Sequence, residues 1–157
     1  MYKDTDIRSE VEDIIKSHDL DRTRIYEVSK LKWHDITEKT EKSFLKKGCT
    51  LHWSNINNDF KDDLKNRSVY IGNNRLWFHQ LKKHIPENKP FYVFLEGRKA
   101  YEPKYWLYEM CINELMTVLE KSYTLMDFYI VSKKFDWLLS EDHEEYLHII
   151  GEQNDCK

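Results

Sequence analysis

The chain has 157 residues, enough for one domain that buries about 70% of the surface its unfolded chain would expose. It contains 5 Trp, 10 Tyr and 7 Phe beside 34% charged residues, a mixture typical of a packed core with a well-solvated surface. The 25 basic and 28 acidic residues give a net charge of −3, a balance that argues against nucleic-acid binding. We therefore expect one domain that folds without a cofactor.

The cysteines and the apolar runs indicate the compartment. Cys49, Cys111 and Cys156 are an odd and sparse set without a CxxC pair, which fits a reducing environment better than a disulfide framework. The first residues contain no apolar core of a signal peptide, and no run of about 18 apolar residues could span a bilayer. These features predict a cytoplasmic protein that does not bind to a membrane.

The N-terminal part, residues 6–48, is predicted to be helical. A first helix is expected to begin after Thr5 or Asp6 and to end near His18, because its apolar residues share one helical face: Ile7, Val11, Ile14 and Ile15. The apolar repeat from Ile25 to Leu31 predicts a second, short helix. In a third helix, Asp35 and Glu38 are spaced as a capping box, and Gly48 follows where a left-handed residue is expected.

The middle of the chain mixes both kinds of element. Residues 49–58 show no clear period, and a short strand followed by an exposed loop is one interpretation of them. Residues 68–71 are expected to form a short strand. Asn73 or Asn74 can cap a helix that runs to Ile85, because Pro86 stops it.

Strands dominate from residue 91 onward. Phe91–Leu95 is a continuous apolar run between a proline and a glycine, the pattern of a central strand covered on both faces. Tyr105–Tyr108 can pair with it as a hairpin, and a short amphipathic helix is expected over Asn113–Ser122. Three further runs predict the closing strands: Phe128–Val131, Trp137–Leu139 and Tyr146–Ile150.

The predicted fold class is therefore α+β, a single domain with a mostly antiparallel sheet covered by helices and a sheet-rich core over residues 68–151. Within the last strands, Trp137 is in phase with Phe135 and Leu139, so all three are expected on one buried face. We expect Trp137 to face the helix that carries Leu115 and Leu119.

No catalytic signature accompanies these elements. The densest set of polar residues is Glu141, Asp142, His143, Glu144 and Glu145, but consecutive residues of a strand connection point in different directions and a metal needs converging ligands. A solvated turn is the simpler interpretation. Cys49 and His52 lack a second pair of zinc ligands, and the chain has only 4 Gly, too few for a phosphate-binding loop. We predict no catalytic residue, no metal and no cofactor.

The C-terminal pattern Tyr129-Ile-Val-x-Lys133-x-x-x-Trp137-Leu-Leu-x-Glu-Asp-His143, closed by Ile149-Ile150-Gly151, resembles the SUKH superfamily of Smi/Knr-type proteins. It also resembles a family of uncharacterised small bacterial proteins, in which Asn and a second His tend to stand at the positions of Asp142 and Glu144. The likeness covers about 30 residues closely and extends loosely from Leu76 to Gly151. Many SUKH members are immunity proteins that bind and neutralise a bacterial toxin.

This resemblance implies a non-enzymatic protein-binding module whose partner is a cognate protein toxin, for example a basic nuclease. The candidate contacts are the acidic loop Glu141, Asp142, His143, Glu144 and Glu145 together with Asp59, Asp62 and Asp63. Such a module is expected to be a monomer or a weak homodimer. The alternative is a small enzyme or a metal- or ligand-binding domain that uses His143 and a group from residues 49–58.

Overall fold

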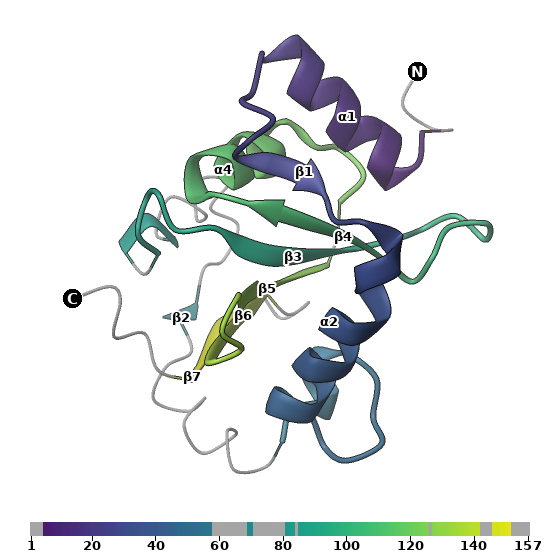
Figure 1. The fold of residues 1–157 in the computed structure, drawn as a ribbon, viewed down its shortest axis with the longest axis vertical. Coiled ribbons are helices and arrows are strands. Elements are labelled where there is room, and N and C mark those ends of the chain that lie inside the picture. The colour runs from purple at the N-terminus through teal and green to yellow at the C-terminus, as the bar shows by residue number, and fades with distance from the viewer. Residues whose placement is uncertain are drawn as a thin grey trace.

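Seven antiparallel strands form one sheet with the spatial order β1-β4-β3-β5-β6-β7-β2 (Figure 1). The computed structural model describes residues 5–57, 69–70, 81–83, 85–125, 127–141 and 146–151, and at residues 69, 70, 141, 146 and 147 the backbone alone. The strands are β1 (Ile25–Glu27), β2 (Val69–Tyr70), β3 (Phe91–Glu96), β4 (Tyr105–Met110), β5 (Phe128–Ser132), β6 (Trp137–Glu141) and β7 (Tyr146–Gly151). The helices are α1 (Ile7–Ser17), α2 (Lys30–Phe44), α4 (Ile112–Lys121) and a 3-10 turn, η2 (Trp53–Asn55). The predicted α+β class with a mostly antiparallel sheet is confirmed.

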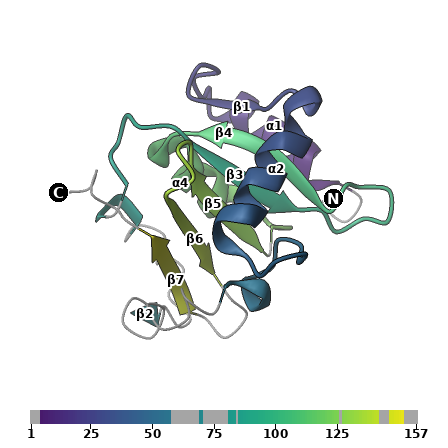
Figure 2. The ribbon, with the colours of Figure 1, turned by 60° about the horizontal axis from the view of Figure 1, so that its bottom comes forward.

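Helices cover both faces of the sheet, because side chains alternate along each strand. Phe91, Val93 and Leu95 of β3 lie in one core cluster with residues of α1 and α4, and we call this side the α1/α4 face. Phe94 and Tyr92 point to the other side, the α2 face, where the core includes Ile36 and Phe44 of α2. Figure 2 shows α2 crossing that face.

Several sequence expectations are confirmed. The Asp6 carboxylate caps α1 by accepting a 2.7 Å hydrogen bond from the backbone N–H of Ser9. The strand β3 is central, paired on one side with β4 and on the other with β5. Trp137 is 4% exposed and belongs to the same core cluster as Leu115, as predicted.

The second predicted helix is wrong, since Ile25–Glu27 is an edge strand. Ile25 pairs with Met110, and the backbone N–H of Val28 donates to the carbonyl of Leu107 at 2.9 Å. Ile25 and Val28 are both buried but lie in different core clusters, one on each face. An edge position beside β4 thus overrides the weak three-residue repeat, and the N-terminal part is not purely helical.

The helix α2 begins earlier than predicted, with Ser29 as its N-cap. Asp35 and Glu38 therefore lie inside the helix and form no capping box. Instead they pair one turn ahead, Asp35 with Lys39 at 3.1 Å and Glu38 with Lys42 at 2.7 Å. Gly48 has the expected left-handed backbone, with φ at +80°.

Phe135 does not share a face with Trp137, contrary to the prediction. It belongs to the turn before β6, has φ of +58°, and packs against the core of the α2 face. Residues 49–57 form no strand but the turn η2 and one bridge between Leu45 and Ile56. Of the helix predicted up to Ile85, the structure describes only residues 81–83, which form a 3-10 turn, and Ile85 itself.

Candidate functional site

The acidic residues chosen from the sequence cannot be placed. Asp59, Asp62 and Asp63 lie outside the described residues, and so do Asp142, His143, Glu144 and Glu145. Glu141 ends β6, but only its backbone is described. These contacts stay predictions.

Polar and aromatic side chains gather on the α2 face at one end of the sheet. We call this set the sheet-end cluster: Tyr26 of β1, Tyr92 of β3, Glu109 of β4, and Lys133 and Phe135 of the turn between β5 and β6. Strand pairing aligns three of them, because Tyr26 is opposite Glu109 and Glu109 is opposite Tyr92. The cluster thus joins residues that are more than 100 positions apart in the chain.

Glu109 is the centre of the sheet-end cluster. It is only 9% exposed, and its carboxylate accepts hydrogen bonds from the Tyr26 hydroxyl and from the Lys133 ammonium, the latter at 2.7 Å. The same ammonium lies 5.7 Å from the centre of the Tyr92 ring. A buried carboxylate is tolerated here because both its neighbours donate to it.

The protonation states in the cluster follow from these contacts. Burial, together with the hydrogen bond to Glu109, raises the pKa of Tyr26 to about 12, so the phenol is neutral near pH 7. The hydrogen bond to Glu109 raises the pKa of Lys133 above its ordinary value, so the ammonium stays charged. Neither group is poised to exchange a proton at neutral pH, which makes general acid–base chemistry a poor fit.

A tight turn fixes the cluster's outer part. The Ser132 hydroxyl accepts from the backbone N–H groups of Asp136 and Trp137, at 2.9 and 3.2 Å, and donates to the Asp136 carboxylate at 2.5 Å. Phe135 adopts the left-handed region that bulky residues rarely occupy, and its ring lies 5.9 Å from that of Tyr92. Such backbone strain in a well-bonded turn is commonly found where a side chain must be presented in one direction.

At the opposite end of the α2 face, two tyrosine hydroxyls bind the segment that follows α2 to the sheet. The Tyr105 hydroxyl donates to the carbonyl of Leu51 at 2.7 Å, and the Tyr129 hydroxyl accepts from the N–H of Trp53 at 3.0 Å. Burial raises the pKa of Tyr105 well above its ordinary value and that of Tyr129 to about 12. Both phenols are therefore neutral structural ties and not reactive groups.

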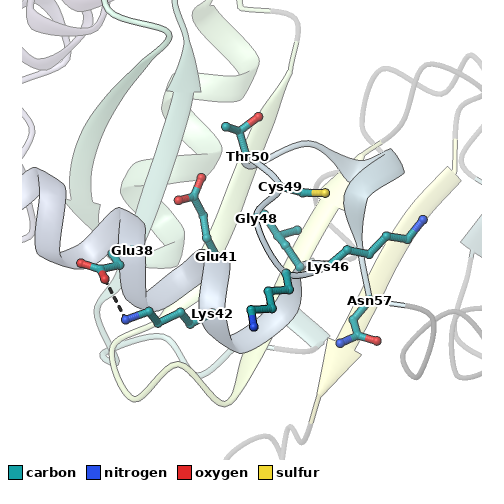
Figure 3. A pocket seen from close by; sticks show the side chains of 10 residues that line it. Glu38, Glu41, Lys42, Lys46, Gly48, Cys49, Thr50 and Asn57 are labelled. Atoms are coloured by element: carbon teal, nitrogen blue, oxygen red, sulfur yellow. Dashed lines mark ion pairs between the residues drawn. The ribbon is translucent and has the colours of Figure 1, made fainter.

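A cavity of about 460 Å³ lies between the end of α2 and the turn that carries Gly48 and Cys49 (Figure 3). Among its charged side chains, Glu38 pairs with Lys42, and the Glu41 carboxylate accepts from the backbone N–H of Leu51 at 3.1 Å. Figure 3 shows the labelled side chains pointing in different directions. The cavity therefore offers no convergent set of groups for chemistry.

Metal binding has no support in the described ranges, where no three His, Cys, Asp or Glu side chains come together. Cys49 and Cys111 are free thiols, and burial raises the pKa of Cys111 above its ordinary value, which disfavours the reactive thiolate. The His52 imidazole contacts the hydroxyl of Ser54 at 2.6 Å. Among the described helices, none combines the length and the apolar character needed to cross a bilayer.

Sequence reasoning missed the sheet-end cluster, although part of its signal is visible. Glu109 is the one charged residue in the strand YWLYEM, and its parity puts it on the same face as Leu107 and Tyr105. Lys133 stands in the motif on which the SUKH resemblance rests. Tyr26 could not be chosen, because its segment was predicted as a helix.

The fold and this cluster define an antiparallel α+β domain that presents a rigid polar and aromatic surface at one sheet end. The chain belongs to a family of unknown function (DUF6756), whose pattern matches residues 3–157. No curated protein and no solved structure matches it.

Proposed function

We propose that this protein is a non-enzymatic protein-binding module whose contact surface includes the sheet-end cluster. The observation that carries the proposal is that Tyr26, 39% exposed, and Lys133, 42% exposed at its side chain, are both held by one buried carboxylate. Tyrosine is enriched among the residues that dominate binding energy, and side chains already fixed lose little entropy on association.

The proposed partner is a cognate protein toxin, which the module neutralises by covering it. This step is supported by the resemblance of the C-terminal motif to SUKH immunity proteins. The two free thiols at Cys49 and Cys111 support a reducing compartment, and we propose that the module acts in the cytoplasm.

The acidic residues fit a basic toxin such as a nuclease, and they remain proposed as a second contact. Glu141 ends β6 and the turn of Lys133 precedes it, so the two contacts would be separated by the length of that strand, about 13 Å. An interface of ordinary size, about 800 Å² on each partner, is wide enough to include both. Opposite charges at its two ends would fix the orientation of the partner.

Co-expression with the toxin encoded in the same gene neighbourhood tests the proposal. Cells that produce the toxin and the unaltered protein should grow, whereas Tyr26→Ala combined with Lys133→Ala should lower protection by at least about tenfold, the loss expected for two central contact residues. Tyr123→Ala is the matched control, because Tyr123 is exposed and its backbone contacts Glu10 of α1, away from the α2 face. Absence of protection by the unaltered protein would refute the toxin assignment.

A further inference from the structure

The helix α2 begins beside β4 (Figure 1), and two indole rings meet there in a corner whose inner ring, that of Trp106, is only 8% exposed. Trp33 of α2 and Trp106 of β4 have ring centres 5.8 Å apart and planes at 86°. Both rings are held by their N–H groups: Trp33 donates to the carbonyl of Val28 at 2.6 Å, and Trp106 donates to the carboxylate of Glu102 at 3.0 Å. The corner is therefore rigid before anything binds in it.

The corner already contains a cation. The ammonium of Lys30 lies 5.7 Å from the centre of the Trp33 ring and 5.5 Å from that of Trp106, within the range in which a ring quadrupole attracts a positive charge. In the described part of the chain, no carboxylate forms an ion pair with Lys30, so the two rings are its main attraction. The two rings thus hold an ammonium group in the corner.

Lys30 is poorly suited to stay there. It is the first residue of α2, where the positive end of the helix dipole repels a cation, and the first turn has no acidic residue to offset this. Its side chain is exposed and long, so it can swing away without disturbing the core. The next residue, Leu31, is 95% exposed, so no packing of this apolar side chain holds the start of α2 in place.

We propose that the Trp33–Trp106 corner is a binding site for the ammonium group of a lysine side chain on another protein, with Lys30 as an internal occupant that the ligand displaces. Lys30 competes with any ligand because it is tethered beside the site. A cation–π attraction of ordinary strength keeps Lys30 in the corner for most of the time, so the corner is open to a ligand for only a fraction of it. Removing Lys30 should therefore tighten ligand binding by about two- to fivefold. The site stands on its own residues and is independent of the sheet-end cluster.

The probe is n-butylammonium chloride, which has the shape and charge of a lysine side chain. It is titrated into the labelled protein while the indole N–H signals of Trp33 and Trp106 are followed by NMR, with n-butanol as the neutral control and sodium chloride for ionic strength. Lys30→Ala should show saturable shifts at both signals and about two- to fivefold tighter binding than the unaltered protein. Lys32→Ala, which removes an equally exposed neighbouring lysine, should bind like the unaltered protein.

A second variant tests whether the shifts come from binding between the two rings. Lys30→Ala combined with Trp33→Leu lacks one wall of the corner and should lose the saturable shift at Trp106, while an unchanged signal from buried Trp137 shows that the fold is intact. A titration with tetramethylammonium then distinguishes a methylated ammonium, which binds more tightly than n-butylammonium, from an unmodified lysine, which does not. The proposal is overturned if Lys30→Ala binds no more tightly than the unaltered protein, or if n-butanol produces the same shifts.

Discussion

Trp137 is the residue through which the last strand pair joins the core. Its ring lies 6.4 Å from that of Phe91, and it belongs to the cluster that also contains Leu115 of α4. Trp137→Ala should lower the free energy of unfolding by about 3 to 5 kcal/mol, because it removes a large buried aromatic and leaves a cavity. Denaturant unfolding measures this, and a loss below about 1 kcal/mol would contradict the burial.

Gly151 illustrates a position where only glycine fits. Its φ is +90°, and a Cβ there would stand 2.1 Å from the carbonyl oxygen of Asp136. Gly151→Ala should therefore destabilise the protein by at least about 2 kcal/mol, since both the backbone and the neighbouring turn would have to move. Thermal unfolding is the measurement.

Gly48 is the matched control for that substitution. It also has a positive φ, +80°, but nothing lies within 4 Å of a Cβ at this position. Gly48→Ala should lower the free energy of unfolding by only about 1 to 2 kcal/mol, which is what the left-handed conformation costs a residue that has a Cβ. If both variants lose the same free energy of unfolding, the close approach at Gly151 does not contribute to stability.

At the scale of elements, strand pairing explains what the sequence predicted and what it did not. The runs Phe91–Leu95 and Phe128–Val131 are apolar throughout and appear as buried strands, because composition alone suffices for a strand covered on both faces. β1 has three residues and depends on its pairing with β4, which a local repeat cannot reveal. Phe135 was placed on the wrong face because its turn conformation interrupts the strand alternation.

The candidate site was even less predictable than the fold. Glu109 and Lys133 meet only because β4 and β5 flank β3, and both side chains reach the same face at the same end of the sheet. No spacing in the sequence encodes that meeting. The one sequence signal that could have indicated it is a charged residue inside an apolar strand, since such a residue must find a partner when it is buried.

Glu102 ties the loop between β3 and β4 to the beginning of α1. Its carboxylate accepts hydrogen bonds from the backbone N–H groups of Ile7, Arg98 and Lys99 at 2.9, 2.7 and 2.6 Å. Burial alone would raise the pKa of Glu102, but these donors and the Trp106 indole outweigh it and hold the pKa below its usual value.

This contact makes stability depend on pH in a defined direction. Because the folded pKa is depressed, the stabilisation is present above the unfolded value of about 4.5 and is lost as pH falls through the folded pKa. The free energy of unfolding should thus fall as the pH is lowered below about 4.5. Glu102→Gln should make this fall less steep. A slope unchanged in Glu102→Gln would contradict the assignment.

Glu96 supplies an internal check, because its pKa is shifted the other way. Burial and the neighbouring Asp127 carboxyl raise the pKa of Glu96, although Lys104 and Arg98 oppose this. The stabilisation that protonated Glu96 contributes to the folded state is therefore present below about pH 4.5, and it is lost as the pH rises through the pKa of Glu96 in the folded protein. Glu96→Gln should remove a slope of opposite sign to that of Glu102.

At the scale of the whole molecule, the two faces of the sheet are covered to different extents. The α1/α4 face is closed by helices and forms the larger core cluster. The α2 face is crossed by one helix and carries polar groups at both ends, one set tying down residues 51–53 and the other forming the sheet-end cluster. A binding surface at the second end requires no change in the core, which fits a module that acts by docking.

Hydrogen–deuterium exchange of the protein with and without the toxin tests the proposed binding surface most directly. Binding through the sheet-end cluster should slow exchange in β1, at the end of β4 and in residues 132–136, and leave α1 and α4 unchanged. A complex that forms while these three segments exchange as fast as in the free protein would contradict it.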